Sequence, residues 1–402
     1  VVSAEHKEFG HQWNPLMYGG IRQQISMLMQ MQSKSSEEFW DNIANYSISA
    51  AVIALRLQPG EPAINLKDLV VCLSNFEMLK NIVGNIRTTD SEDHKSGKAY
   101  LVSYLKYWWN DDKNCYNSSH YKNLMLGPIA KLSSYCHSTY DHILNSYTPD
   151  VNVKDCILNG KVVILSMSSL ADKTGTELLG RLFIADIARA VGEIQQEKSR
   201  NLLSTPIILD EYGSFNDITQ LDLFQLARSA WVPLIIALQG KGFFDDSNKN
   251  FAENALGQCQ THLYGDVRDQ QTREFASYMS GTMVEKLIQE GYGSNFASTA
   301  GSESTGMVTT DSTGLSYTKG YKEQRDTLIQ PDDFLDLDKG DAIMVGSTGV
   351  SKVRMPLTVT QYPTYHWHEM HLTRHTKTET RPGLRLWDTY IKETASFLGI
   401  NL

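Results

Sequence analysis

The chain has 402 residues, of which 41% are hydrophobic and 10% aromatic, and this apolar content excludes a disordered protein. Its longest apolar run, at residues 48–57, is about half the roughly 20 residues of a membrane-spanning helix, which excludes a transmembrane protein for this chain. The 37 basic and 46 acidic residues give a net charge of −9, which argues against a basic coat that binds nucleic acid. The length predicts two or three domains.

The five cysteines lie far apart and form no C-x-x-C pair. This spacing leaves zinc and redox motifs unsupported and favours a reducing compartment. The chain starts at Val1 without a methionine, signal peptide or targeting segment, so we expect it to be a fragment of a longer protein.

Residues 1–20 predict a short strand-like segment that ends in turn-forming pairs, Asn14-Pro15 and Gly19-Gly20. From Ser35 the pattern becomes helical, beginning with a capping box at Ser35-Ser36-Glu37-Glu38. Helical spacing continues through residues 66–86, 100–109 and 124–144, and no convincing strand pattern lies between Ser35 and Tyr147. Residues 35–150 are therefore predicted to form an all-α domain.

After Pro149 the pattern changes to short aliphatic strands that alternate with helices. Strands buried on both faces are predicted at residues 160–166, 206–211 and 232–239, with weaker candidates at 261–267 and 342–345, and a long helix at 176–196. This alternation indicates a parallel sheet covered by helices, so the predicted fold class is α/β.

Residues 291–320 are rich in Ser, Thr and Gly and contain few apolar residues. We interpret them as a surface loop, and alternatively as a loop that touches substrate or a neighbouring subunit. From Tyr362 onward the chain is polar, with many aromatic residues and histidines, and we expect an appended helical tail.

The sharpest chemical signal is the run Ile207-Ile208-Leu209-Asp210-Glu211, which brings two adjacent carboxylates to the C-terminal end of a buried strand. Open α/β sheets bind their ligands at that edge. In P-loop NTPases the first such acid holds Mg²⁺ through water, and the second orients the attacking water. The alternative interpretation is a strand that ends in two exposed acids without a function.

Two further residues strengthen the nucleotide interpretation. Gln239 ends the next predicted strand, at the same edge as Glu211, where an amide can sense a γ-phosphate or position water. Arg228 lies in a helical stretch, where a guanidinium can neutralise charge on a neighbouring subunit's nucleotide. Taken alone, Gln239 fits a satisfied strand terminus and Arg228 a solvated helix charge.

A phosphate-binding loop G-x-x-x-x-G-K-[ST] is absent from the 402 residues. The chain has three Gly-Lys pairs, at Gly97, Gly160 and Gly240, and each lacks the following Ser or Thr and the upstream glycine. Either this chain lacks part of a nucleotide site or its function is not ATP hydrolysis.

An ordered set of motifs resembles the cytoplasmic ATPase domain of type IV secretion coupling proteins, the TraD/TraG and DotL class. The set covers roughly residues 10–360 in the order of the family. Its members are Trp13-Asn14-Pro15-Leu16, Glu38–Ala44, Gly160–Ser166 with Leu178–Phe183, Leu209–Ser214, Ala227-Arg228, Leu238-Gln239, Arg325, Leu328–Phe334 and Leu337–Gly340. Two positions depart from the family: Gly240 replaces a Ser after Gln239, and Gln258 replaces an Asn.

The resemblance implies a RecA-like domain at residues 1–34 and 151–361, a mainly parallel sheet with helices on both faces, interrupted by the all-α domain and followed by an extension at 362–402. It also implies that membrane helices, the P-loop and an early strand precede Val1. Asp210 would then be the acid that holds Mg²⁺-ATP, Glu211 the catalytic base, Gln239 the sensor and Arg228 a finger acting in trans, in a homo-hexameric ring.

By the same resemblance, the full-length protein would be an ATPase at the cytoplasmic face of the bacterial inner membrane. It would recruit protein effectors or DNA, with adaptor proteins, and feed them into a type IV secretion or conjugation channel; this chain alone would be inactive. The alternative is a non-catalytic docking platform for substrates and adaptors. A DNA pump of the FtsK or HerA type fits the fold but lacks the all-α insert.

Two other groups suggest weaker alternatives. The histidines at 366, 368, 371 and 375 lie beside Glu369 and could bind a transition metal, but they have no cysteine partner and no firm helical register. The aromatic residues at 104, 107, 108 and 109 could stack on bases, although packing between helices explains them better.

Overall fold

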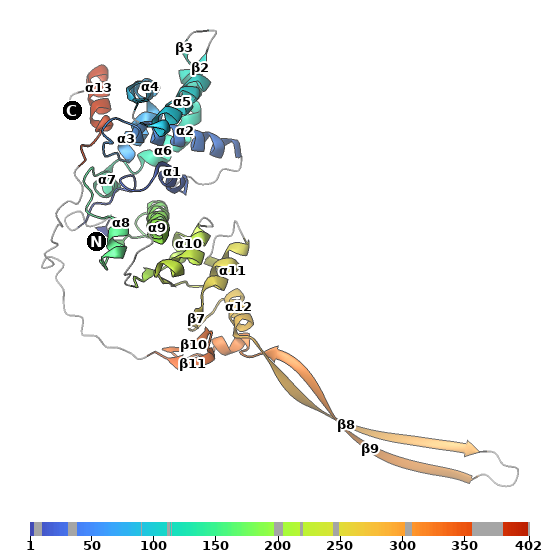
Figure 1. Ribbon diagram of the computed structural model, residues 1–402. Helices are drawn as coiled ribbons and strands as arrows, with labels where there is room; N and C mark the ends of the chain where they lie inside the picture. Colours follow the sequence, from blue (N-terminus) through green and yellow to red (C-terminus); the bar gives the residue numbers. More distant parts are fainter. Residues whose placement is uncertain are drawn as a thin grey trace. The chain divides into compact units, whose positions relative to one another are not determined.

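The computed structural model describes residues 1–3, 10–30, 38–89, 91–110, 113, 115–196, 204–217, 220–243, 249–301, 308–355 and 381–400. The chain forms two compact units (Figure 1). The first contains residues 1–239, 243–258 and 362–402, and the second contains residues 240–242 and 259–361.

The first unit contains the helical block that the sequence predicts. The helices of this block are α2 (Glu38–Arg56), α3 (Leu66–Ser74), α4 (Phe76–Asn85), α5 (Glu92–Tyr107), α6 (Ser118–Ser133) and α7 (Ser138–Leu144), and α1 (Ile21–Gln30) precedes it. Asn75 divides the predicted 66–86 helix, because its N–H ends α3 on Val71 O (2.9 Å) and its side chain accepts from Met78 N (3.0 Å) to begin α4. A two-residue strand pair, β2 (Trp109–Asn110) with β3 (Cys115–Tyr116), also lies in this block, where no strand was expected.

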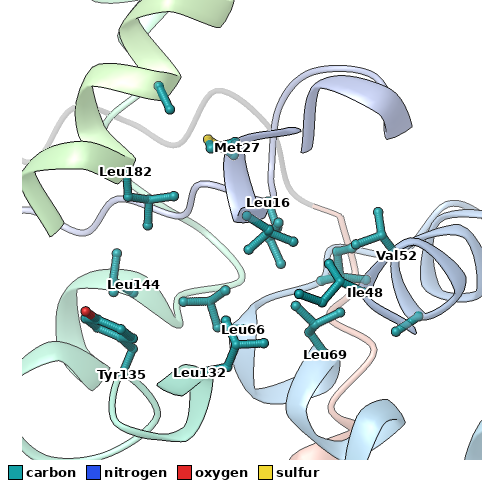
Figure 2. Packing of buried hydrophobic residues seen from close by; sticks show 14 of the residues in the cluster. Leu16, Met27, Ile48, Val52, Leu66, Leu69, Leu132, Tyr135, Leu144 and Leu182 are labelled. Carbon is teal, nitrogen blue, oxygen red and sulfur yellow. The ribbon is translucent and has the colours of Figure 1, made fainter. Parts of the chain in front are cut away.

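Aliphatic residues from several helices form the core of this block, together with residues outside it (Figure 2). Ile48 and Val52 of α2 pack with Leu69 of α3, and all three are fully buried. Of the four aromatic residues predicted to pack between helices, Tyr104 and Trp108 are buried and Trp108 contacts Tyr121 edge to face, whereas Tyr107 is 58% exposed.

The Trp13-Asn14-Pro15 segment contacts two loops of the helical block, one before α3 and one after α7. The Asn14 side chain is fully buried and donates to Ile64 O and Ser146 O, both at 2.8 Å. Its own oxygen accepts from Leu16 N at 2.9 Å. Because both polar atoms of this amide form hydrogen bonds, Asn14 fixes its segment against these two loops.

A buried charge network attaches the same segment to α9 (Lys173–Gln196). Trp13 Nε1 donates to Asp186 Oδ2 at 2.8 Å, and Arg189 Nε donates to Asp186 Oδ1 at 2.7 Å. Arg189 also donates to Glu193 at 2.7 Å. Asp186 is 1% and Arg189 6% exposed, and burial raises the pKa of Asp186. Removing either charge would therefore leave the other buried without its partner, which is strongly destabilising.

The three predicted aliphatic strands exist but are short. β1 (Val2–Ser3) pairs in parallel with β4 (Leu165–Ser166), and β5 (Ile207–Leu209) pairs in parallel with β6 (Leu234–Ile236). The remaining elements of this unit are α8 (Val153–Leu158), η1 (Tyr212–Ser214), α10 (Leu221–Leu226), η3 (Ala227–Ala230), α11 (Lys249–Gln258) and α13 (Leu386–Leu398).

The α/β class is confirmed, but the described residues show two separate parallel pairs and no continuous parallel sheet. The prediction that these strands are buried on both faces is wrong for β5 and β6 as they stand. Ile208 is 69% and Ile235 53% exposed, because no described element covers that face.

The second unit contains an antiparallel sheet with strand order β11-β10-β7. Its strands are β7 (Thr261–Tyr264), β10 (Asp341–Gly346) and β11 (Gly349–Arg354), packed with α12 (Gln270–Ser280) and η5 (Pro331–Phe334). Strands at 261–267 and 342–345 were predicted correctly, but their assignment to the parallel sheet was wrong. The two-residue connection between β10 and β11 permits only antiparallel pairing, since parallel strands need a long crossover.

Of the segment predicted as a loop at 291–320, residues 291–301 and 308–320 belong to a long β-ribbon, and residues 302–307 lie outside the described residues. β8 (Thr282–Gly301) pairs antiparallel with β9 (Val308–Thr327) along all twenty residues of each strand (Figure 1). The loop prediction failed because Ser, Thr and Gly suggested a loop by composition, whereas threonine and tyrosine favour strands.

The predicted helical tail is described as α13, while residues 356–380, including the four clustered histidines, lie outside the described residues. α13 docks on the helical block. Leu384 N donates to Ala63 O at 3.0 Å, and Asp68 accepts from Leu386 N at 2.8 Å and from the Tyr147 hydroxyl at 3.0 Å. Burial raises the pKa of Asp68 to about 6.

Candidate functional site

The two adjacent acids and the predicted glutamine lie at one edge of the β5–β6 pair. Asp210 and Glu211 follow the last residue of β5, and Gln239 lies three residues beyond β6. The backbone ladder continues past both strands, with Ala237 N donating to Leu209 O (3.0 Å) and Tyr212 N to Ala237 O (3.1 Å). The carboxyl ends of the two parallel strands therefore present these three residues together.

Glu211 has a left-handed backbone, with φ 50° and ψ 41°, which is strained for a residue that has a Cβ. Its N–H donates to Asp210 Oδ1 at 3.0 Å, and its carbonyl accepts from Ser214 N at 2.8 Å. The left-handed residue turns the chain sharply from β5 into η1. This turn keeps both carboxylates at the sheet edge.

The buried side chain of Tyr212 packs beneath the strained turn and stabilises it. Its ring is fully buried, with its centroid 5.8 Å from that of Phe215 and 5.7 Å from that of Phe224. Its hydroxyl donates to Gln220 Oε1, and Gln220 is itself buried. A backbone strained by about 1–3 kcal/mol persists only where such surroundings fix it.

Hydrogen bonds from the Asn216 side chain also connect the loop after β5 to the loop after β6. Asn216 Nδ2 donates to Gly213 O at 2.8 Å and to Phe243 O at 2.9 Å. The loops approach so closely that a Cβ on Gly213 would lie 2.7 Å from Phe243 Cβ, so only glycine fits there. Sequence reasoning assigned no function to Tyr212, Asn216 and Gln220, although Tyr212-Gly213 directly after the acids was a usable signal.

The site is open to solvent. Asp210, Glu211 and Gln239 are exposed, and neither acid forms an ion pair with any residue that the structure describes. Mg²⁺ retains much of its hydration shell and needs only one or two carboxylates, so solvated oxygen ligands of this kind fit it. No group of three or more His, Cys, Asp or Glu residues suited to direct metal binding occurs in the described part of the chain.

Arg228 lies elsewhere. It belongs to η3, which precedes β6, and Thr205 N donates to Trp231 O at 3.2 Å just before β5 begins. This hydrogen bond places the end of η3 at the N-terminal edge of the strand pair, opposite the acids. Arg228 is exposed there, so the structure does not bring it to Asp210 and Glu211 within one chain.

Each Gly-Lys pair has a local structural explanation. Gly97 and Lys98 lie within α5, where Lys98 Nζ donates to Ile86 O at 2.7 Å. Lys161 pairs with Asp155 after α8, and Lys241 N donates to Thr272 Oγ1 at 2.7 Å. None of these turns has the form of a phosphate-binding loop.

Comparison with known proteins gives one family match. Residues 205–339 match the family described as the TraM recognition site of TraD and TraG. No curated protein matches the chain. Across the described ranges, no helix is both long and apolar enough to span a membrane.

Several solved structures share the fold. The bacterial conjugative coupling protein TrwBdeltaN70, in its unbound monoclinic form, aligns with a TM-score of 0.59 and 13% identity over 88% of this chain and 73% of its own. TrwB with ADP and Mg²⁺ aligns with a TM-score of 0.56 and 13% identity, over 87% and 72%. TrwB with a non-hydrolysable ATP analogue aligns with the same TM-score and coverage at 12% identity.

Identity of 12–13% establishes a common fold, and the family match adds a specific segment that contains β5, β6 and the acid pair. Residues 205–339 are therefore similar to the TraM recognition site of TraD and TraG, within a chain that shares its fold with the coupling protein TrwB.

Proposed function

We propose that this chain is part of an ATP-driven coupling protein whose RecA-like domain is built around the β5–β6 pair. The observation that carries the proposal is the common edge at which β5 ends in Asp210 and Glu211 and β6 leads to Gln239. Two adjacent acids held by a rigid turn, with an amide beside them, match what phosphoryl transfer to water requires.

In this proposal Asp210 holds the magnesium ion of Mg²⁺-ATP through water, which its exposure permits. Glu211 orients the attacking water and accepts its proton, while Gln239 responds to the γ-phosphate. Bound Mg²⁺ would neutralise charge on the transferring phosphoryl group. The buried Tyr212 and Asn216 keep Glu211 in a fixed position, so that little reorganisation is needed at the reacting water.

Arg228 has a different role in this proposal. Because it lies at the edge opposite the acids, we assign it to the nucleotide of the neighbouring subunit in a homo-hexameric ring. A guanidinium supplied in trans stabilises the charge of the transition state. The exposed position of Arg228 is consistent with contact to another subunit.

We further propose that the full-length protein works at the cytoplasmic face of the bacterial inner membrane. There it would recruit protein effectors or DNA, through adaptor proteins, and feed them into a type IV secretion or conjugation channel. The description of the matched family as a TraM recognition site supports an adaptor-binding role for residues 205–339.

The phosphate-binding loop is not among the 402 residues, so the test uses the full-length protein. We expect Glu211→Gln to reduce ATP turnover about 10²–10⁴-fold, the usual contribution of a general base, without weakening nucleotide binding. Glu253→Gln, at an exposed position on α11, is the matched control and should retain activity. Equal turnover in wild type and Glu211→Gln would refute the role of Glu211.

A mixing experiment tests the trans role of Arg228. Arg228→Ala and Glu211→Gln should each be inactive alone, because every site then lacks one of the two groups. Mixed rings contain interfaces at which an intact Glu211 meets an intact Arg228, so the mixture should regain part of the activity. A mixture that stays inactive would show that both residues act within one subunit.

The second candidate is a non-catalytic docking platform, which the missing G-x-x-x-x-G-K-[ST] motif favours. The two candidates differ in nucleotide binding. If the full-length protein binds no ATP in the presence of Mg²⁺, the platform is the correct function. Binding with turnover that single-stranded DNA stimulates would instead favour a conjugative pump.

A further inference from the structure

Four polar side-chain atoms in the core of the helical block have no hydrogen-bond partner among the residues that the structure describes. They are the Ser47 hydroxyl on α2, the Tyr104 hydroxyl on α5, the Trp108 indole N–H just after α5 and the Tyr121 hydroxyl on α6. Each of these residues is at most 1% exposed. Buried polar groups in native proteins nearly always have a partner, so four such groups in one core require an explanation.

The four groups converge from three helices. α2 packs on both α5 and α6, and the ring centroid of Trp108 lies 6.1 Å from that of Tyr104 and 4.9 Å from that of Tyr121. Burial raises the pKa of Tyr104, and the polar groups of Ser47, Tyr121 and Trp108 act in the opposite direction, so all three lie around its hydroxyl. They are close enough to influence that hydroxyl, yet no two of the four groups reach the geometry of a direct hydrogen bond.

Local bonding within the helices does not satisfy these groups. A serine inside a helix commonly donates to the carbonyl four residues earlier, but Ser47, in the middle of α2, does not. The indole N–H of Trp108 is only a donor, whereas the three hydroxyls can each donate and accept. Polar groups that face one another from just beyond hydrogen-bond distance are commonly bridged by water.

The chemistry of the four groups selects a neutral ligand. A water molecule accepts two hydrogen bonds and donates two, and the site offers one obligatory donor and three hydroxyls that serve in either direction. Buried waters typically make about three hydrogen bonds to groups that otherwise lack a partner. A metal ion or an anion does not fit, because none of the four groups is charged and an unpaired buried charge is very costly.

We propose that one water molecule binds in the core between α2, α5 and α6, hydrogen-bonded to Ser47, Tyr104, Trp108 and Tyr121. It accepts from Trp108 Nε1 and from one hydroxyl, and it donates to the other two hydroxyls. The water links three helices through side chains that do not bond to one another, and so fixes the rotation of each helix about its axis. This site does not depend on the nucleotide chemistry proposed above.

Removal of one hydroxyl tests the proposal through the sign of the change in stability. With the water bound, Tyr104→Phe deletes a hydrogen bond and should lower the melting temperature of the 402-residue chain by roughly 2 °C. If the hydroxyl has no partner, the same change removes a buried unsatisfied group and should raise the melting temperature. Tyr107→Phe, at a 58% exposed position of α5, is the matched control and should leave the melting temperature unchanged.

A count of bound water in solution separates a water from direct contacts between the side chains. Oxygen-17 magnetic relaxation dispersion detects water molecules that exchange slowly with the solvent. The triple variant Ser47→Ala, Tyr104→Phe, Tyr121→Phe leaves the water only Trp108 as a partner, so wild type should hold one more slowly exchanging water than this variant.

Replacing hydrogen-bonding groups together by apolar groups of the same shape is nearly neutral, so the triple variant should fold, which circular dichroism checks. If it does not fold, the double variant Tyr104→Phe, Tyr121→Phe serves for the same count. Equal numbers of slowly exchanging waters in wild type and variant would overturn the proposal. A melting temperature of Tyr104→Phe that is equal to or higher than that of wild type would also overturn it.

Discussion

The helical block and the β5–β6 pair use the same aliphatic residues in different ways. In the block, Ile48, Val52 and Leu69 are fully buried by residues of the first unit. In the strand pair, Ile208 and Ile235 are more than half exposed although they are central strand residues. The block therefore contains its own core, whereas the strand pair that carries the acids keeps one apolar face uncovered. The edge that carries the acids is instead positioned by Tyr212 and Asn216.

The largest expected effect is at the buried ion pair of α9, between Asp186 and Arg189. Arg189→Met removes the cation that contacts Asp186 and leaves a buried charge unpaired, which costs about 3–5 kcal/mol of the free energy of unfolding. Urea unfolding followed by circular dichroism measures this loss. Lys80→Met, which breaks an exposed pair with Glu77, should change stability by less than about 1 kcal/mol. Equal losses would show that Asp186 is not charged in the fold.

A matched pair of truncations tests the comparison directly. Leu69→Ala deletes a fully buried side chain of α3 and should cost about 2–5 kcal/mol in urea unfolding. Ile208→Ala deletes a largely exposed one and should stay within about 0.5 kcal/mol. If Ile208→Ala is as costly as Leu69→Ala in the full-length protein but not in this chain, a further segment covers the β5–β6 face there.

Sequence periodicity predicted the helices and the centres of the aliphatic strands, because both depend on local apolar spacing. It did not predict which strands pair, since β7 and β10 have ordinary strand composition and lie far apart in the sequence; only the antiparallel β10–β11 pair follows from its short connection. The acid pair was predictable from its place after a strand. Its support was not, because the hydrogen bond of Tyr212 to Gln220 joins side chains eight residues apart.

The docked tail provides a pH-dependent difference within the helical block. Asp68 has an ordinary pKa of about 3.9 when unfolded, and burial raises its pKa to about 6 in the fold. The folded chain thus binds the extra proton, so the stability contributed by Asp68 is complete below about pH 4 and is lost as pH rises through 6. Between pH 4 and 7 we expect wild type to lose on the order of 1–3 kcal/mol relative to Asp68→Asn, measured by urea unfolding at each pH. Parallel pH profiles would contradict a titrating Asp68.

The smallest expected change in stability separates the support of the site from its chemistry. Tyr212→Phe keeps the buried ring but removes the hydroxyl that donates to Gln220, which should cost about 1 kcal/mol of unfolding free energy. Because the loosened turn carries Glu211, ATP turnover of the full-length protein should fall further than this loss of stability explains. Tyr390→Phe, on α13, is the control and should leave turnover unchanged. If Tyr212→Phe lowers stability but leaves turnover intact, the polar support does not position Glu211, and the left-handed turn is held by the backbone hydrogen bonds of the strand pair alone.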